Sequence, residues 1–326
     1  MKAFQAQSLD SIDEYKLVDL PMPEPKAGEV RVAIKACGIG YFDALGATGR
    51  YQVKPPLPYI PGVEIAGVVD ALGADVSNLK VGDRVIAMGI GAGGCAEYGC
   101  VPAYMSAKIP DRLGFAEGAA LRINYLTALH GLRERGNLKA GEKLLVFGAA
   151  GGVGIAAVQV GKMMGAEVIA VASTEAKRAF AKQHGADHVI DTNAEGWRDR
   201  LKAISRSVDV ILDPVCGPLF EQAFRSLNWR GRHLVVGFAG GEGKIPALPA
   251  NLALVKGSAL LGVDLRQYMI FQTADYLALL NDLMQLIETQ KIAPVAGKKF
   301  PFAQTREALA FALSGKGMGK TVLEMV

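Results

Sequence analysis

The chain of 326 residues is half hydrophobic and 21% charged, which is typical of a well-packed globular protein and excludes a disordered one. Its length favours two domains over one. The net charge is only +4, and basic residues alternate with acids, as in "EAKRAFAKQHGADH". This pattern is typical of solvated helix faces, so we expect no nucleic-acid partner.

Targeting and redox signals are weak throughout the sequence. The four cysteines form no CxxC motif, which indicates buried thiols in a reducing compartment. The first residues lack the apolar core of a signal peptide, and no run of eighteen apolar residues predicts a membrane span. We therefore expect a cytoplasmic protein without a membrane partner.

Residues 1–118 are rich in Gly, Pro and β-branched residues. Strand-like runs recur in "EVRVAIKAC", "GVEIAGVVDAL", "DRVIAMG" and "GCAEYGCV", separated by turn sequences such as "KPPLPYIPG". This part predicts an irregular antiparallel β domain with a single helix, over residues 41–49.

From residue 119 the pattern changes to helices alternating with strands. "AALRINYLTALHGLRER" is helical by its period, and six strand-like runs follow: "KLLVFG", "EVIAVAS", "HVID", "VDVILD", "RHLVVGFAG" and "SALLGVDL". Such alternation predicts a doubly wound parallel sheet. Near residue 265 the chain leaves this sheet. A long helix is expected over 273–290, and a last strand is expected to rejoin the N-terminal domain.

A glycine-rich loop joins the first of these strands to a helix. In "LLVFGAAGGVGIAAVQVG", Ala149, Gly151 and Gly154 give an A-x-G-x-x-G variant of the dinucleotide fingerprint. Gly151 would let a pyrophosphate approach the backbone, Gly154 would let helix and strand pack closely, and the helix N-terminus would offer N–H groups. The alternative is merely a tight turn, but the strand before it and the helix after it favour dinucleotide binding.

The stretch "VASTEAKR" predicts which dinucleotide is bound. Ser173 lies 22 residues after Gly151, where an acid would accept hydrogen bonds from the adenosine ribose. Ser173 can instead donate to a 2′-phosphate, and Lys177 adds a positive charge one helical turn later. We therefore expect NADPH in preference to NADH. The alternative is that Lys177 and Arg178 are ordinary exposed helix residues, and the nearby Glu175 would disfavour a phosphate.

Longer segments carry a resemblance over nearly the whole chain. These include "KPPLPYIPGVEIAGVV", "GAAGGVGIAAVQVGKMMGAEVIAVAS" and "DPVCGPLFEQAFRSLNWRGRHLVVGFAGG". With them the chain resembles a zinc-independent medium-chain dehydrogenase/reductase of the NADPH:quinone oxidoreductase family. The resemblance implies an α/β protein in which a GroES-like β-rich catalytic domain (1–118 with 265–326) carries an inserted Rossmann NADPH-binding domain (119–264). It implies that the coenzyme contacts Ala150, Gly151, Gly152, Val153, Gly154, Ser173, Lys177, Phe238, Ala239 and Val263.

Two substitutions bear on a metal site. Zinc-dependent relatives hold a catalytic zinc beside a glutamate, but Gly40 stands where the ligand cysteine is usual. Val63 stands where the ligand histidine would precede Glu64. Zinc needs three or four N, S or O ligands, and neither residue can supply one. We therefore expect no metal.

The resemblance implies hydride transfer from NADPH to a quinone or another α,β-unsaturated carbonyl. A quinone is electrophilic enough for positioning to suffice. Candidate polar contacts are Tyr51, Asn124 and Thr127, although each could simply pack in its loop or helix. The alternatives are an enoyl-thioester or alkenal C=C reductase, or a non-enzymatic NADPH-binding and RNA-binding protein of the crystallin kind.

The run "GSALLGVDL", residues 257–265, is almost wholly apolar. At the edge of a sheet it would invite the same strand of a second copy, and relatives commonly dimerise through this edge. We expect a homodimer. The alternative is that the following segment, "RQYMIFQTADYL", covers the strand within one chain.

Overall fold

The computed structural model describes residues 1–88, 93–193, 195–240 and 244–325. These residues form two compact units. The first unit comprises Met1–Arg122 and Pro294–Val326, and the second comprises Ile123–Ala293. Both ends of the chain belong to the first unit.

The first unit is built on a mixed sheet. In the described part of the chain its order is β14-β15-β3-β4-β5-β7, with β6 also paired to β3. Its strands are β3 (Glu29–Ile39), β4 (Glu64–Leu72), β5 (Arg84–Met88), β6 (Tyr98–Pro102), β7 (Ser106–Lys108), β14 (Ala296–Pro301) and β15 (Lys320–Glu324). A separate hairpin joins β1 (Lys2–Gln5) to β2 (Lys16–Asp19). Neighbouring strands are antiparallel except β14 and β15, so the antiparallel prediction is confirmed for the N-terminal strands.

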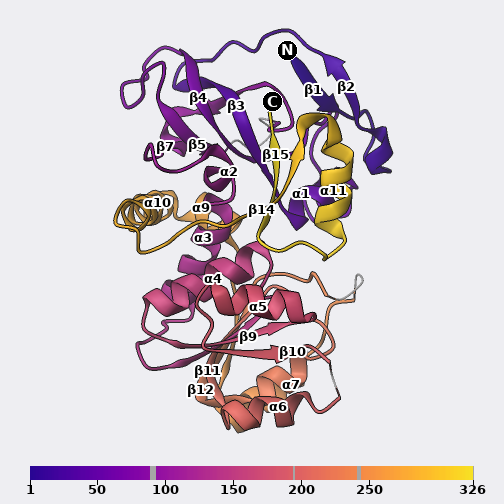
Figure 1. Cartoon of the computed structure of the whole chain (residues 1–326), viewed down its shortest axis with the longest axis vertical. Coiled ribbons are helices and arrows are strands. Elements are labelled where there is room, and N and C mark those ends of the chain that lie inside the picture. Colours follow the sequence, from indigo (N-terminus) through magenta and orange to yellow (C-terminus); the bar gives the residue numbers. More distant parts are fainter. Residues whose placement is uncertain (89–92, 194, 241–243, 326) are drawn as a thin grey trace. The chain divides into compact units, whose positions relative to one another are not determined.

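Short helices complete this unit: α1 (Tyr41–Ala47), α2 (Phe115–Gly118), α11 (Thr305–Leu313) and the 3₁₀ turns η1 (Ile12–Glu14), η2 (Ala103–Met105) and η4 (Phe302–Gln304). The helix expected over residues 41–49 is confirmed by α1, but the prediction of a single helix is wrong because α2 also forms. Four residues are too few to show a helical period. Gly118 of α2 packs closely on β4, where an added Cβ would lie 3.2 Å from that of Ala66. Figure 1 shows α11 beside β14 and β15.

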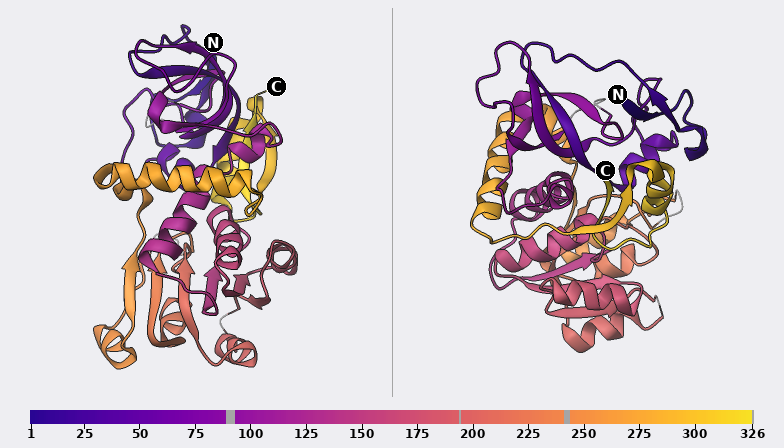
Figure 2. Two further views of the ribbon diagram at one scale, coloured as in Figure 1. Left: turned by 90° about the vertical axis from the view of Figure 1, so that its left-hand side faces the viewer. Right: turned by 45° about the horizontal axis from the view of Figure 1, so that its top comes forward.

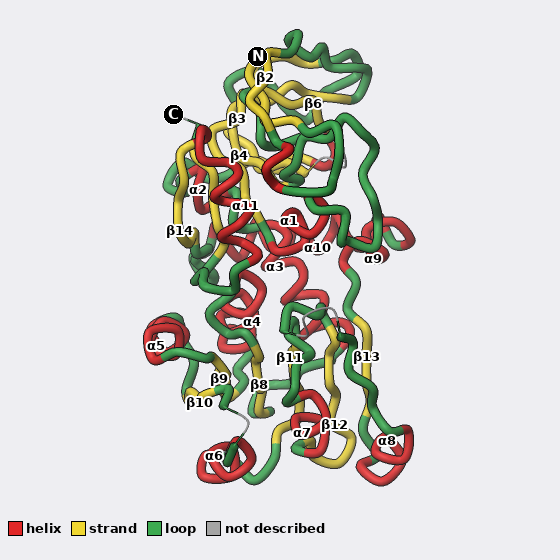
Figure 3. The backbone as a smooth tube through the Cα atoms, turned by 90° about the vertical axis from the view of Figure 1, so that its right-hand side faces the viewer, coloured by secondary structure: helices red, strands yellow, loops and turns green. Residues whose placement is uncertain are grey.

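The second unit contains the predicted parallel sheet. All six predicted strands are present: β8 (Lys143–Phe147), β9 (Glu167–Ala172), β10 (His188–Asp191), β11 (Val208–Asp213), β12 (Leu227–Val235) and β13 (Ala259–Gly262). They pair in parallel in the order β10-β9-β8-β11-β12-β13. The strand order reverses between β8 and β11, which is where doubly wound sheets bind ligands. Figure 3 shows β13 at the far edge, beside β12.

Helices of the second unit precede, connect or follow these strands. They are α3 (Arg122–Leu129), the π-helix η3 (His130–Arg135), α4 (Gly152–Met163), α5 (Glu175–Gln183), α6 (Trp197–Ile204), α7 (Phe220–Arg225), α8 (Ala250–Lys256), α9 (Leu265–Phe271) and α10 (Thr273–Glu288). The long helix expected over 273–290 is confirmed by α10, which is seen from its side, in amber, in the left view of Figure 2. No helix in the described residues is long and apolar enough to cross a membrane.

The division between the units differs from the one expected at residues 118 and 265. Residues 265–293 cluster with the parallel sheet. The physical reason is contact with η3: the rings of His130 and Tyr268 stack 4.0 Å apart, and Arg133 forms an ion pair with Asp282 at 3.0 Å. Sequence period alone identified α10 as a helix but could not assign its partner.

Candidate coenzyme and substrate site

The glycine-rich loop after β8 has the close packing predicted for it. Gly148 has a positive φ of 56°, and its carbonyl accepts a hydrogen bond from the Gly151 N–H at 2.8 Å. A Cβ on Gly154 would lie only 2.1 Å from the Gly148 carbonyl oxygen. Glycine at 154 is therefore what lets α4 approach the end of β8.

Gly151 has a different reason to be glycine. It is the N-cap of α4 with φ of −74°, and an added Cβ would lie 3.3 Å from the Gly148 oxygen. This φ is ordinary for alanine, and the contact is tight but tolerable, so an alanine here would fit with little strain. Since the first N–H groups of a helix have no intrahelical acceptor, a small residue here keeps them open to an anion.

The segment after β9 carries the residues predicted to select the coenzyme. Ser173 is exposed, and Thr174 caps α5 by accepting a hydrogen bond from the Lys177 N–H at 3.2 Å. Lys177 is half-buried, and this burial lowers the pKa of its ammonium group. Arg178 is not an ordinary exposed residue, because its guanidinium donates to Asp191 and to the Ala172 carbonyl. Of the two basic residues that follow Ser173, Arg178 is therefore held by contacts within this unit.

The other predicted coenzyme residues follow β12 and β13. Phe238 is 44% exposed, and the Ala239 N–H donates to the Pro214 carbonyl at 3.1 Å. Val263 is buried, and its N–H donates to the Val235 carbonyl at 2.9 Å. Because β8, β9, β12 and β13 are parallel, all ten predicted residues lie at or just beyond the carboxyl edge of one sheet.

Asn124 and Thr127 lie in α3 and are both buried. An added Cβ on Gly152 would lie 2.7 Å from the Asn124 amide nitrogen, so Asn124 rests against the first turn of α4. The Thr127 hydroxyl donates to the Ile123 carbonyl at 2.6 Å. Asn124 is thus brought to the coenzyme loop, whereas the Thr127 hydroxyl proton is used within its own helix.

Tyr51, the remaining candidate, lies in the first unit. Its N–H donates to the Leu45 carbonyl at 3.2 Å, and its ring lies 6.2 Å from that of Phe42. The Phe42 ring in turn lies 5.5 Å from the ammonium nitrogen of Lys320. Phe42 therefore neighbours both Tyr51 and Lys320, a lysine that sequence analysis did not single out.

Lys320 belongs to a buried cluster of charged groups. Its ammonium lies 3.2 Å from Oε2 of Glu64, and both side chains are almost fully buried. Oε1 of Glu64 accepts a hydrogen bond from the Arg122 N–H at 2.5 Å. Asp43, also buried, accepts from the N–H groups of Gly40 and Val63 at 2.7 and 3.2 Å. Burial raises the pKa of Asp43 to about 6, although Lys320 and the two hydrogen bonds oppose this rise.

The residues at this cluster do not fit a zinc ion. Gly40 and Val63 have no side-chain donor atom, and an added Cβ at Gly40 would lie 3.0 Å from Nζ of Lys320. A lysine ammonium in that position would repel a cation. Across the described ranges, no group of three or more His, Cys, Asp or Glu could hold a metal.

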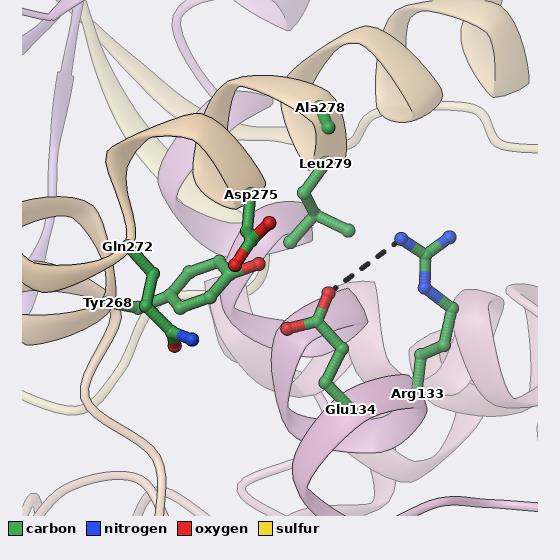
Figure 4. Close-up of a pocket in the computed structure, with 7 residues that line it drawn as sticks. All are labelled: Arg133, Glu134, Tyr268, Gln272, Asp275, Ala278 and Leu279. Carbon is green, nitrogen blue, oxygen red and sulfur yellow. Dashed lines mark ion pairs between the residues drawn. The ribbon is translucent and has the colours of Figure 1, made fainter.

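A pocket of about 250 Å³ lies elsewhere in the second unit. Figure 4 shows it lined by side chains of η3, α9, α10 and the residue between these last two helices, namely Arg133, Glu134, Tyr268, Gln272, Asp275, Ala278 and Leu279. Arg133 is engaged by Glu134 at 3.8 Å and by Asp282 at 3.0 Å. The carboxylates of Glu134 and Asp275 would repel a phosphate, so this pocket does not suit a coenzyme pyrophosphate.

Comparison with known proteins agrees with this architecture. Residues 26–111 match the alcohol dehydrogenase GroES-like domain, and residues 152–282 match the zinc-binding dehydrogenase model. A quinone oxidoreductase-like protein 2 homolog of Nematostella vectensis is 36% identical, covering 90% of this chain and 81% of that protein. The quinone oxidoreductase of Thermus thermophilus is 31% identical, with a TM-score of 0.85 over the full length of both chains. The CurK enoyl reductase is 26% identical, with a TM-score of 0.89 over 100% of this chain and 99% of that one.

A GroES-like unit joined to a Rossmann-type parallel sheet defines the medium-chain dehydrogenase/reductase class of NAD(P)H oxidoreductases. Within that class, the chain belongs to the quinone oxidoreductase family. The match to a zinc-binding dehydrogenase model reflects the shared Rossmann-type unit, because residues 40 and 63 lie outside the matched range.

Proposed function

We propose that this protein is an NADPH-dependent reductase that delivers hydride to quinones or other α,β-unsaturated carbonyls without a metal. The observation that carries the proposal is the carboxyl edge of the parallel sheet. There a glycine-rich helix N-terminus is followed by Ser173 and Lys177, with no acid at position 173. A 2′-phosphate suits that combination, whereas a carboxylate at 173 would repel it.

Bound NADPH would supply the hydride, and the chain would supply binding and orientation. The first turn of α4 would hold the pyrophosphate, with Asn124 fixing Gly152 beside it. Ser173 and Lys177 would hold the adenosine phosphate, and Phe238, Ala239 and Val263 would border the nicotinamide end. Tyr51 would contact the substrate. Metal independence is supported by Gly40 and Val63, which lack ligand atoms.

Reduction of an enoyl thioester or alkenal is the second candidate. The similarity to the CurK enoyl reductase over the whole chain favours it. Both reactions place hydride on a carbon conjugated to a carbonyl, so the same coenzyme site would serve either. The two candidates differ in the size of the group beyond the carbonyl.

A substrate panel tests the proposal directly. Quinones, enones, alkenals and enoyl thioesters are each mixed with NADPH or NADH, and coenzyme absorbance is followed before and after exhaustive chelation. We expect the highest kcat/KM with NADPH and a quinone, unaffected by the chelator. Preference for NADH, preference for enoyl thioesters, or one zinc per chain lost together with activity would each overturn part of the proposal.

We also propose that the protein is a homodimer formed through β13. This strand ends the sheet order, and Leu260 on it is 42% exposed. Trp229, Leu254 and Val255, on β12 and α8 beside it, are more than 70% exposed. Pairing of β13 with the same strand of a second copy would bury these apolar side chains in an isologous interface. It would also give hydrogen-bond partners to the backbone groups along the free edge of β13.

A further inference from the structure

Asp213 is a buried carboxylate at the carboxyl end of β11, and the proposed function gives it no role. Its Oδ1 accepts hydrogen bonds from the N–H groups of Val215 and Cys216 at 2.9 and 2.8 Å. Its Oδ2 lies 3.1 Å from Nε2 of the buried His233. Burial of a carboxylate is unfavourable unless it is paired or hydrogen-bonded. These bonds offset that cost, and they fix the segment that follows β11, residues 214–217, which we call the β11 loop.

The β11 loop depends on this anchor because its backbone is irregular. Cys216 has a φ of 44°, in the left-handed region that residues other than glycine rarely adopt. The carboxylate holds two successive N–H groups in this turn, and the Cys216 thiol donates to the Asp213 carbonyl at 3.5 Å. Such a conformation persists only where its surroundings enforce it. Without the carboxylate, the loop would therefore relax.

Val215 connects the β11 loop to the glycine-rich loop after β8. An added Cβ on Gly148 would lie 3.0 Å from Cγ2 of Val215, so this side chain packs against the turn at Gly148. The Gly148 carbonyl in turn accepts a hydrogen bond from Gly151, the N-cap of α4. The position of Val215 therefore bears on the turn that presents the first N–H groups of α4.

The β11 loop also contacts the loop after β12. The Gly240 N–H donates to the Val215 carbonyl at 2.9 Å, and the Ala239 N–H donates to the Pro214 carbonyl at 3.1 Å. An added Cβ on Gly240 would lie only 2.3 Å from Cγ1 of Val215. Since β11 lies between β8 and β12 in the sheet, its loop lies between the two loops proposed to hold the coenzyme.

We infer that Asp213 is a positioning residue for the coenzyme. It fixes the β11 loop, and through Val215 it sets the spacing between the loops after β8 and β12. The inference rests on the proposed function for the place where the coenzyme binds, but not for the choice between NADPH and NADH. Binding groups that are ordered beforehand lose less freedom when the ligand arrives, so a loosened β11 loop lowers coenzyme affinity.

The test compares Asp213→Ala with Asp213→Asn, because alanine removes both acceptors and asparagine keeps one oxygen for the N–H groups of Val215 and Cys216. Asp209→Ala is the matched control, since Asp209 lies near the start of the same strand and accepts from the Lys143 N–H at 2.8 Å. Coenzyme fluorescence gives the Kd, and urea unfolding gives the stability. We expect Asp213→Ala to raise the Kd about tenfold or more, as for one lost hydrogen bond to a charged group. Asp213→Asn should restore the affinity, and Asp209→Ala should lose stability alone.

Val215→Ala is the second variant, because it trims the side chain between the two loops and leaves the buried carboxylate in place. It should weaken coenzyme binding in the same direction. Wild-type affinity in a folded Asp213→Ala, or in Val215→Ala where the first variant does not fold, would overturn the inference and leave the proposed function standing. An equal loss of affinity in Asp209→Ala would also overturn it. A wild type that prefers NADH would refute the proposed coenzyme, whereas a selective loss of NADH affinity in Asp213→Ala would still support the role of Asp213.

Discussion

Replacing Gly154 with alanine should damage both folding and coenzyme binding, because this glycine holds α4 against the end of β8. The added Cβ would lie 2.1 Å from the Gly148 carbonyl oxygen and 2.7 Å from Cα of Ala149. Non-bonded atoms pack best at about 3.5 Å or more, so the helix and the loop must separate by more than about 1 Å.

Two consequences follow from a displacement of this size. Overpacking in a dense interior costs about 1–3 kcal/mol, so the free energy of unfolding should fall by that amount. The N–H groups of the first turn of α4 would also move by about 1 Å from the pyrophosphate, which can cost about 10²-fold where geometry is critical. Thermal or urea unfolding measures the first effect, and titration of NADPH fluorescence measures the second.

Gly151→Ala is the matched control, since its added Cβ would meet the Gly148 oxygen at 3.3 Å and its φ of −74° suits alanine. This variant should keep nearly all of its stability and lose NADPH affinity alone, because the methyl group would stand where the pyrophosphate approaches. The reasoning is refuted if Gly154→Ala is as stable as the wild type, or if both variants bind NADPH normally.

Three further predictions test other parts of the molecule. Lys177→Ala should reduce the preference for NADPH over NADH by about tenfold or more, since a charge-assisted phosphate contact contributes about 1.5–3 kcal/mol; equal affinities in the unmodified protein would contradict the role of Lys177. Leu261→Pro should remove a donor from β13 and yield monomer or aggregate by light scattering; a stable dimer would place the interface elsewhere. Asp43 has a pKa of about 6 in the folded protein and an ordinary value of 3.8, so the folded state holds its proton to higher pH. The free energy of unfolding of the wild type, compared with that of Asp43→Asn, should therefore fall by up to about 3 kcal/mol as pH rises from about 4 to 6. A difference in urea unfolding that does not depend on pH would contradict this.

Local pattern was sufficient to predict most of the architecture. The strands from β8 to β13 are short apolar runs, and segments with the helical period separate them along the chain. All six strands were located from that alternation. The loop after β8 was identified because its glycines stand between a strand and a helix. The packing at Gly154 follows from the same local spacing.

Long-range partners were beyond the reach of pattern. Arg178 pairs with Asp191 because β9 and β10 are neighbours, which no periodicity reveals. Lys320 meets Glu64 across more than two hundred residues of sequence, through the pairing of β15 with β3. The sequence around Lys320 is a strand-like run with a lysine at its start, and nothing local indicates that this lysine is buried.

The return of the chain to the first unit also orders events during translation. The second unit is one continuous segment, Ile123–Ala293, and can assemble while the ribosome is still adding residues. The first unit cannot, since β15 is the last of the described strands to be synthesised and must insert between β14 and β3. Until it does, the nascent chain exposes an open edge on β3 and leaves Glu64 without its lysine. The step that completes the sheet is thus the same step that delivers the buried cation.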